Sequence, residues 1–293
     1  MSSLKNSISL AAKTQVVQSG KEQYAYRRFG KGSGLPLLLL QHFTGTLDNW
    51  DPALTDELAE QRNIILFDNA GIGVSSGTVP DTMSAMADHV IAFLDAMKLP
   101  RVDILGFSLG GCLAQIVALN QPGRVRRMLL IGTAPEGGED IMHLNKPEIA
   151  DVLNDHSLKG YEPLAKIFFA PSASSLSAGK DFVARVTART TDQDRPSGSE
   201  VAGQQMKAFQ AWEAQRDDRF GKLKNIKHPC LVIHGALDTM ISSMNAYWLA
   251  QYLPNAVLLV YPDSAHGVLF QYHTAVAEAA CRFLDDQSDR AML

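Results

Sequence analysis

The sequence is poor in cysteine and carries no large excess of charge of either sign, and both shortages exclude whole classes of protein. Its three cysteines are odd in number, far apart and without metal-ligand spacing: Cys112, Cys230 and Cys281. We therefore expect reduced thiols in a cytoplasmic protein that uses no metal and no other cofactor. The net charge of −4 at pH 7 lacks the basic excess of a nucleic-acid-binding protein.

Long hydrophobic runs are missing as well. The longest, residues 35–40, is far shorter than the roughly 18 to 20 residues needed to span a bilayer, so we expect it to form a buried strand. The N-terminal residues contain no sustained apolar stretch, and no secretory signal is expected there. The partner that remains is a small-molecule substrate, and association into a homodimer is left open.

What the sequence does contain is enough apolar material for a sizeable core, since 46% of its 293 residues are hydrophobic. Six short apolar runs alternate with segments of helical periodicity: residues 35–41, 63–68, 102–107, 127–132, 230–235 and 256–262. Such runs are typical of strands buried on both faces, and the alternation predicts an α/β fold with a doubly wound parallel sheet. Residues 6–17 and 22–30 alternate apolar with polar positions and predict an antiparallel edge.

The alternation of strands and helices is interrupted between residues 135 and 224, where the pattern is mostly helical, and it resumes at Pro229. Ligands of open α/β sheets bind at the carboxyl ends of the strands, where this insertion emerges. We therefore interpret residues 135–224 as a helical lid on a core formed by residues 1–134 and 225–293. The alternative is a helical subdomain that only shields the sheet.

Ser108 lies between Gly106 and Gly110, at the point where an apolar strand-like run passes into a helix-like segment. The motif G-x-S-x-G alone is weak, because short motifs often match by chance. Its context is that of a nucleophile elbow, in which a sharp turn exposes the serine and the glycines let strand and helix pass closely. The competing interpretation is a purely structural turn.

A nucleophilic serine needs a histidine as base and a carboxylate that orients the histidine. In hydrolases with such an elbow the carboxylate and then the histidine follow the serine along the chain. Asp238 follows the run at 230–235, and His266 follows the run at 256–262, so both should reach the sheet edge that carries Ser108. Asp263 and Glu136 compete with Asp238 for the role of the acid.

The developing oxyanion of such a reaction needs backbone N–H donors. One candidate is the amide of Leu109, directly after the serine and at the start of the predicted helix. The second is the amide of Phe43, in the loop that follows the run at 35–41.

Five segments, QHFTGT…W, FDNAGIGVSSG, GFSLGG, HGALD and AHG, together resemble the α/β-hydrolase superfamily, in its lid-bearing branch of esterases, cofactor-free haloperoxidases and C–C bond hydrolases. The resemblance covers nearly the whole chain outside the insertion. It implies a mostly parallel, eight-stranded twisted sheet flanked by helices. It also implies that Ser108 is the nucleophile, Asp238 the acid and His266 the base, with the amides of Phe43 and Leu109 as oxyanion donors.

The chain departs from this family where Gln41 and His42 replace the usual His-Gly pair before the oxyanion residue. An imidazole therefore stands beside the expected oxyanion hole, and we interpret His42 as pocket-lining rather than as a general base. The other expected pocket-lining residues are aromatic: Trp50, Phe168, Phe169, Phe209 and Trp212.

These observations lead to the hypothesis of a serine hydrolase that cleaves a small or medium, largely apolar carboxylic ester or lactone through an acyl-enzyme. The same three residues also serve cofactor-free haloperoxidases (perhydrolases) and C–C bond hydrolases, which stay open as alternatives. A hypothesis of another class is a small-molecule receptor built on a hydrolase fold.

Overall fold

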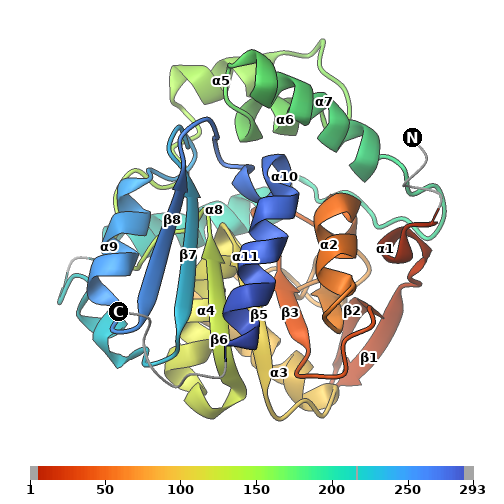
Figure 1. Cartoon of the computed structure of the whole chain (residues 1–293), viewed down its shortest axis with the longest axis vertical. Helices are drawn as coiled ribbons and strands as arrows, with labels where there is room; N and C mark the ends of the chain where they lie inside the picture. Colours follow the sequence, from red (N-terminus) through yellow and green to blue (C-terminus); the bar gives the residue numbers. More distant parts are fainter. Residues whose placement is uncertain (1–5, 216, 287–293) are drawn as a thin grey trace.

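The structure is a computed structural model that describes residues 6–215 and 217–286. Eight strands form one sheet in the order β1-β2-β4-β3-β5-β6-β7-β8 (Figure 1). Strand β2 pairs antiparallel with both β1 and β4, and all other neighbouring strands are parallel. The strands are β1 (Gln15–Ser19), β2 (Glu22–Phe29), β3 (Leu37–Leu40), β4 (Ile64–Phe67), β5 (Val102–Phe107), β6 (Val125–Ile131), β7 (Cys230–Gly235) and β8 (Ala256–Tyr261). The predicted mostly parallel, eight-stranded sheet is confirmed.

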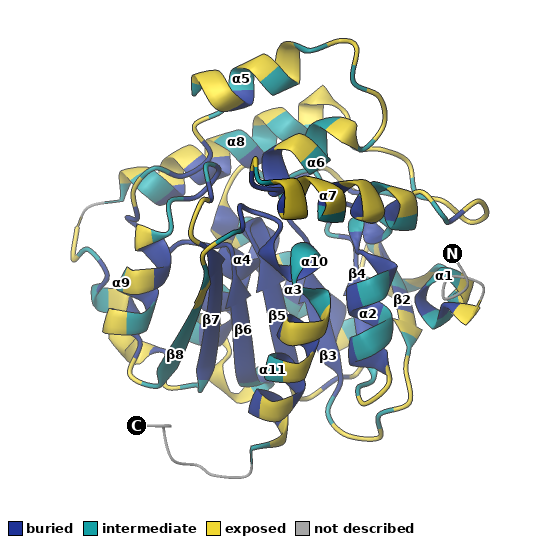
Figure 2. Cartoon of the chain, turned by 45° about the horizontal axis from the view of Figure 1, so that its top comes forward, coloured by how far each residue is buried: buried dark blue, intermediate teal, exposed yellow. Residues whose placement is uncertain are grey.

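The six predicted parallel strands all form, and their burial explains why the sequence shows them so clearly. Every residue of β3, β4, β5 and β7 is buried, because helices cover both faces of the sheet (Figure 2). The edge strand β8 differs, since its residues are only partly buried and Val260 is exposed.

Helices flank the sheet on both faces. Helices α2 (Pro52–Ala59) and α11 (His273–Asp285) pack together on one face, and α3 (Met83–Ala96) and α4 (Leu109–Asn120) pack together on the other (Figure 1). Helix α9 (Met244–Tyr252) packs on β7 and β8, and the short α10 (Val268–Gln271) precedes α11. Helix α2 begins with the Asp51 side chain accepting a hydrogen bond from the Ala53 amide, with Pro52 in the first turn.

The antiparallel edge forms, but its first strand is shorter than predicted. Residues 8–11 are helix α1 (Ile8–Ala11), capped by the Ser7 side chain, which accepts a hydrogen bond from the Leu10 amide. The alternation of apolar and polar residues thus predicts a strand that begins too early. The Ser7 side chain caps a short helix at these residues instead, and a local side-chain hydrogen bond of this kind competes with strand pairing. The expected absence of a secretory signal concerns a segment whose first five residues lie outside the described residues.

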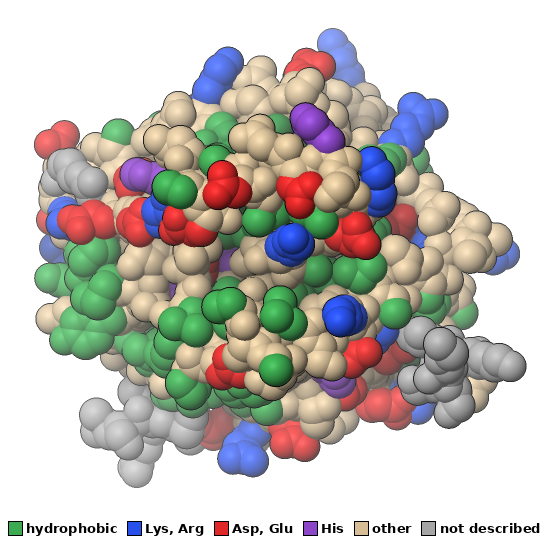
Figure 3. All heavy atoms as spheres, turned by 90° about the horizontal axis from the view of Figure 1, so that it is seen from above, with side chains coloured by type: hydrophobic (Ala, Val, Ile, Leu, Met, Phe, Trp, Pro, Cys, Tyr) green, Lys and Arg blue, Asp and Glu red, His purple; other side chains and the backbone are tan. Residues whose placement is uncertain are grey.

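Among the described residues between β6 and β7 there are four α-helices: α5 (Pro147–Asn154), α6 (Glu162–Phe168), α7 (Ala173–Val186) and α8 (Ser199–Ala214). Helices α5, α6 and α7 lie beyond the carboxyl ends of the parallel strands (Figure 1). Seen from that side, Lys and Arg side chains are scattered among acidic and apolar ones rather than gathered in one patch (Figure 3).

None of the helices in the described part of the chain is long and apolar enough to cross a membrane. All three cysteines are buried and unpaired. Burial raises the pKa of the Cys112 and Cys230 thiols to about 12, so neither is a reactive thiolate at neutral pH.

Candidate active site

Ser108 occupies a sharp turn between β5 and α4. Its backbone lies at φ 56° and ψ −117°, a region that is strained for any residue with a side chain. The turn needs both neighbouring glycines, because a Cβ on Gly106 would lie 2.4 Å from the Gly110 carbonyl oxygen. A Cβ on Gly110 would lie 2.1 Å from the carbonyl oxygen of Leu40 in the neighbouring strand. The sequence pattern thus marks a close approach of three backbone segments.

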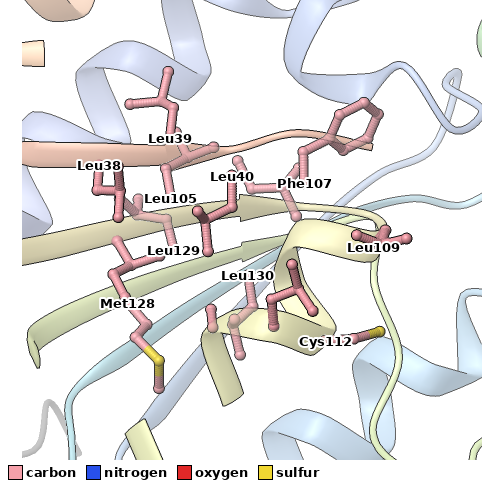
Figure 4. Packing of buried hydrophobic residues seen from close by; sticks show 14 of the residues in the cluster. Leu38, Leu39, Leu40, Leu105, Phe107, Leu109, Cys112, Met128, Leu129 and Leu130 are labelled. Carbon is pink, nitrogen blue, oxygen red and sulfur yellow. The ribbon is translucent and has the colours of Figure 1, made fainter. Parts of the chain in front are cut away.

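Hydrogen bonds from the adjacent strand hold this strained residue in place. The Ser108 amide donates to the Ile131 carbonyl at 2.9 Å, and the Ser108 carbonyl accepts from the Thr133 hydroxyl at 2.7 Å. Phe107 and Leu109 lie on either side of the turn where β5 passes into α4 (Figure 4). The Ser108 hydroxyl itself is buried without a partner among the described residues, so it is free to bind an incoming group.

Asp238 and His266 meet at the same edge of the sheet. The loop after β7 carries Asp238 and the loop after β8 carries His266, and His266 Nδ1 lies 2.7 Å from Asp238 Oδ2. The other carboxylate oxygen accepts hydrogen bonds from the amides of Met240 and Ile241 at 2.9 and 3.0 Å. Burial raises the pKa of Asp238, but the charge of His266 and the hydrogen bonds from His234 and His266 outweigh it and hold the pKa well below its usual range. The carboxylate therefore stays ionised beside the imidazole.

His234, which its place at a strand end predicts to be a packed histidine, is a second histidine on Asp238. It is fully buried, and its Nε2 lies 3.1 Å from Asp238 Oδ2 and 3.0 Å from the Ile241 carbonyl oxygen. Both neighbours accept hydrogen bonds, so Nε2 carries the proton. A histidine four residues before a loop aspartate is the signal that could have pointed to this contact.

The two competing carboxylates are engaged elsewhere. Asp263 accepts hydrogen bonds from the hydroxyls of Ser172 and Ser174, which lower its pKa. Glu136 lies 2.6 Å from Lys222 Nζ in an ion pair. Of the three candidate acids, only Asp238 contacts His266.

The loop after β3 contains the second expected oxyanion donor. The Phe43 carbonyl accepts from His42 Nδ1 and from the Thr44 hydroxyl, both at 2.7 Å. The His42 carbonyl accepts from the Gly45 amide at 3.1 Å. In the part of the chain that the structure describes, neither the Phe43 amide nor the Leu109 amide donates a hydrogen bond, so both are available to an anion.

His42 lies beside the site as a neutral, buried group. Its ring centroid is 5.5 Å from that of Phe107 and 5.3 Å from that of Phe168, and both phenyl rings also contact His266. Burial lowers the pKa of His42 to about 3. Because Nδ1 donates to the Phe43 carbonyl, Nε2 is a lone-pair acceptor, and no described residue donates to it.

The other aromatic residues expected around the pocket divide into two groups. Phe168 contacts His266, and Phe209 contacts Phe43, so both adjoin the site. Phe169 packs on Phe182. Trp50 lines a small void with Arg27, Asp48 and Arg189. Trp212 lines a separate cavity of about 440 Å³ between α3, α4 and α8.

The site is closed in this structure. Ser108 and His266 are 0% and 2% exposed, and the Gly267 amide donates to the carbonyl of Phe168, the last residue of α6, at 2.8 Å. Within the described ranges no cluster of His, Cys, Asp and Glu could hold a metal ion. The arrangement offers a serine, a histidine–carboxylate pair and two free amides in an apolar enclosure.

Comparison with known proteins places this chain in a family. Residues 36–271 match the model of the alpha/beta hydrolase fold family. A solved alpha/beta hydrolase fold protein from Chitinophaga pinensis is 38% identical, with a TM-score of 0.86, over 95% of this chain and 99% of that one.

Two curated relatives are named for hydrolytic activities. A 2-hydroxymuconate semialdehyde hydrolase from Pseudomonas sp. (strain CF600) is 27% identical over 89% of this chain and 90% of its own. A poly(3-hydroxyalkanoate) depolymerase from Ectopseudomonas oleovorans is 28% identical over 91% of this chain and 90% of its own. The chain therefore belongs to the alpha/beta hydrolase fold family and is an enzyme of that family.

Proposed function

We propose that this enzyme is a serine hydrolase that cleaves a small or medium, largely apolar carboxylic ester or lactone through an acyl-enzyme. The observation that carries the proposal is the 2.7 Å contact of His266 Nδ1 with the ionised Asp238, at the edge of the sheet where Ser108 is held on a strained turn. This arrangement leaves Nε2 of His266 as the base, since Nδ1–H is committed to the carboxylate.

In the proposed reaction His266 Nε2 takes the proton of the Ser108 hydroxyl while Oγ bonds to the acyl carbon. The carbonyl electrons move onto oxygen, and the amides of Phe43 and Leu109 bind the oxyanion. His266 then gives the proton to the departing alcohol oxygen, and the acyl–oxygen bond breaks. Water then gives a proton to His266 and its oxygen bonds to the acyl carbon, and the acyl–Oγ bond breaks as His266 returns the proton to Ser108 and the acid leaves. Asp238 stabilises the imidazolium throughout.

The surroundings support an apolar acyl or alcohol group. The rings of Phe107, Phe168 and Phe270 contact one another, and the first two also contact His266. A charged group brought into such an enclosure would be costly, whereas an apolar chain gains by burial.

Access to the closed site requires movement, and we propose that the inserted helices act as the lid. Helix α6 covers His266 through Phe168. A substrate can reach Ser108 only if this helix shifts, which is the role of lids in related geometries. The buried, reduced cysteines agree with the cytoplasmic location that forms part of this proposal.

Replacement of Ser108 by Ala tests the proposal. The variant should lose labelling by a fluorophosphonate probe and at least 1,000-fold of its turnover of p-nitrophenyl esters, because the nucleophile is gone. Turnover is measured across acetate to octanoate esters and lactones of graded size. Wild-type turnover by Ser108→Ala would show that the chemistry lies elsewhere.

Three further assays on the wild-type protein separate the competing functions. Halide oxidation at millimolar acetate and hydrogen peroxide, faster than ester hydrolysis, would favour the perhydrolase. Cleavage of a vinylogous diketone without ester hydrolysis would favour the C–C hydrolase. A single slow turnover that leaves the acyl group on the protein would favour the receptor, whereas rapid multiple turnover excludes it.

A further inference from the structure

The loop that carries Phe43 is held from outside by one helix of the insertion. Gln205, in α8, is buried, and its Oε1 accepts a hydrogen bond from the Thr44 amide at 2.6 Å. Four residues further along α8, Phe209 contacts the Phe43 ring with centroids 6.3 Å apart. One face of α8 therefore contacts both Phe43 and Thr44 at the tip of the loop.

The contacts with α8 stabilise a loop whose backbone is strained. Thr44 has φ 59°, a left-handed conformation that is unfavourable for a β-branched residue. Its amide would be left unpaired without Gln205, and an unpaired, partly buried amide costs free energy comparable to a lost hydrogen bond. The other polar bonds of the turn are internal: His42 Nδ1 and the Thr44 hydroxyl on the Phe43 carbonyl, and the Gly45 amide on the His42 carbonyl.

These bonds fix the planes of the two peptide groups that flank Phe43. The bond from the Gly45 amide holds the peptide that carries the Phe43 N–H, while Gln205 holds the next peptide from the opposite side. The Phe43 N–H is thereby left free. Its direction depends on both bonds, and one of them comes from the insertion.

We propose that Gln205 is a positioning residue that completes the oxyanion hole only when α8 is docked on the core. When α8 moves away, the bond from the Thr44 amide to Gln205 breaks, the strained turn relaxes and the Phe43 amide leaves its place. Closure over an ester would thus assemble the second oxyanion donor. This inference rests on the proposed function, since it requires the tetrahedral oxyanion of a Ser108 adduct.

Gln205→Leu tests the inference, because it keeps the bulk of the side chain but removes the acceptor. We expect kcat for a p-nitrophenyl ester to fall about 10- to 100-fold with KM changed less than about twofold, as for a displaced oxyanion donor. Gln205→Glu keeps an acceptor oxygen and should restore kcat to within about fivefold of wild type. Gln210→Leu makes the same change at an exposed position of α8 and should match wild type.

A second readout responds to the oxyanion hole itself. Ser108 Oγ adds to the carbonyl carbon of an alkyl trifluoromethyl ketone, and the resulting alkoxide occupies the oxyanion hole. Its inhibition constant should rise in Gln205→Leu by the same factor as kcat/KM falls, whereas that of the matching alkyl alcohol should not change. If Gln205→Leu does not fold, as judged by thermal unfolding, Gln205→Asn, which withdraws the acceptor by one methylene, takes its place.

The outcomes separate the two proposals. Wild-type protein that is not labelled at Ser108 by the fluorophosphonate would overturn the proposed function. Labelled wild type, together with a Gln205→Leu variant whose kcat and trifluoromethyl ketone inhibition match wild type, would overturn only the positioning role. A Gln205→Leu variant with lower thermal stability, but with the wild-type ratio of the inhibition constants of the trifluoromethyl ketone and the alcohol, would also overturn it. That result is expected of a bond that only stabilises the fold.

Discussion

At the scale of single residues, Asp238 is surrounded by donors that keep it ionised. His266 contacts Oδ2 at 2.7 Å, and two loop amides bind Oδ1. In Asp238→Asn the amide group must turn an N–H toward one of these donors, which disfavours the tautomer that His266 needs. We expect kcat for ester hydrolysis to fall about 10⁴-fold with little change in the fold. Asp263→Asn is the matched control and should keep kcat within about threefold, because Asp263 binds serine hydroxyls rather than His266. Equal losses in both variants would contradict the assignment of the acid.

The sequence predicts those site residues whose place in the fold follows from the pattern of the residues next to them. Ser108, Asp238 and His266 each follow an apolar strand, and parallel strands bring such positions to one edge. Contacts between distant segments could not be predicted in this way. The bond of Gln205 to the loop spans 161 residues, and helical periodicity alone does not say which neighbour a buried side chain meets.

At the scale of elements, an ion pair joins α7 to α2 through a fully buried carboxylate. Arg185, in the last turn of α7, makes two hydrogen bonds of 2.8 and 2.7 Å to Asp51, the fully buried cap of α2. The apolar runs of the sequence predict which segments are strands and which are helices. They do not predict the contact of α7 with α2, because Asp51 and Arg185 are 134 positions apart. A geometric pairing of this kind depends on how whole elements pack.

Removal of Arg185 should therefore be costly to stability. Arg185→Leu leaves the Asp51 carboxylate buried without its partner, and we expect the free energy of unfolding to fall by about 3 kcal/mol. Urea denaturation measures this change. Arg185→Leu combined with Asp51→Asn should recover part of the loss, because no uncompensated charge remains. Lys166→Leu, which breaks a 4.0 Å ion pair between exposed Lys166 and Asp155, should leave stability unchanged; a similar loss there would argue against the Arg185–Asp51 pair as the cause.

At the scale of the whole molecule, a cluster of charged side chains joins the segment after α7 to β2, to the loop after β3 and to residues 9–12. Arg27 lies 2.6 Å from Asp48, and the Asp194 amide donates to the Asp48 carboxylate at 2.7 Å. Arg189 donates to the carbonyls of Ser9 and Ala12. The buried Asp68 has no hydrogen-bond donor among the described residues, and carboxylates outnumber the two arginines. Burial, followed by the charge of Asp48, raises the pKa of Asp194 to about 6, and burial together with Asp194 raises that of Asp68.

These raised pKa values make the stability of the protein depend on pH with a definite sign. At Asp194 the folded chain binds more protons than the unfolded chain between the ordinary aspartate pKa near 4 and about 6, so the contribution of this group to the free energy of unfolding falls as pH rises through this range. Asp194→Asn removes that loss, and its free energy of unfolding relative to wild type should rise by about 1 to 2 kcal/mol between pH 4.5 and pH 8.

Asp192→Asn is the control of opposite sign: partial burial raises the pKa of Asp192, but hydrogen bonds from Thr14 outweigh this and lower it. The difference between each variant and wild type, measured by urea denaturation at each pH, cancels the titration of all other groups. A constant difference for Asp194→Asn across the range would show that Asp194 is ionised throughout and that another group compensates its charge.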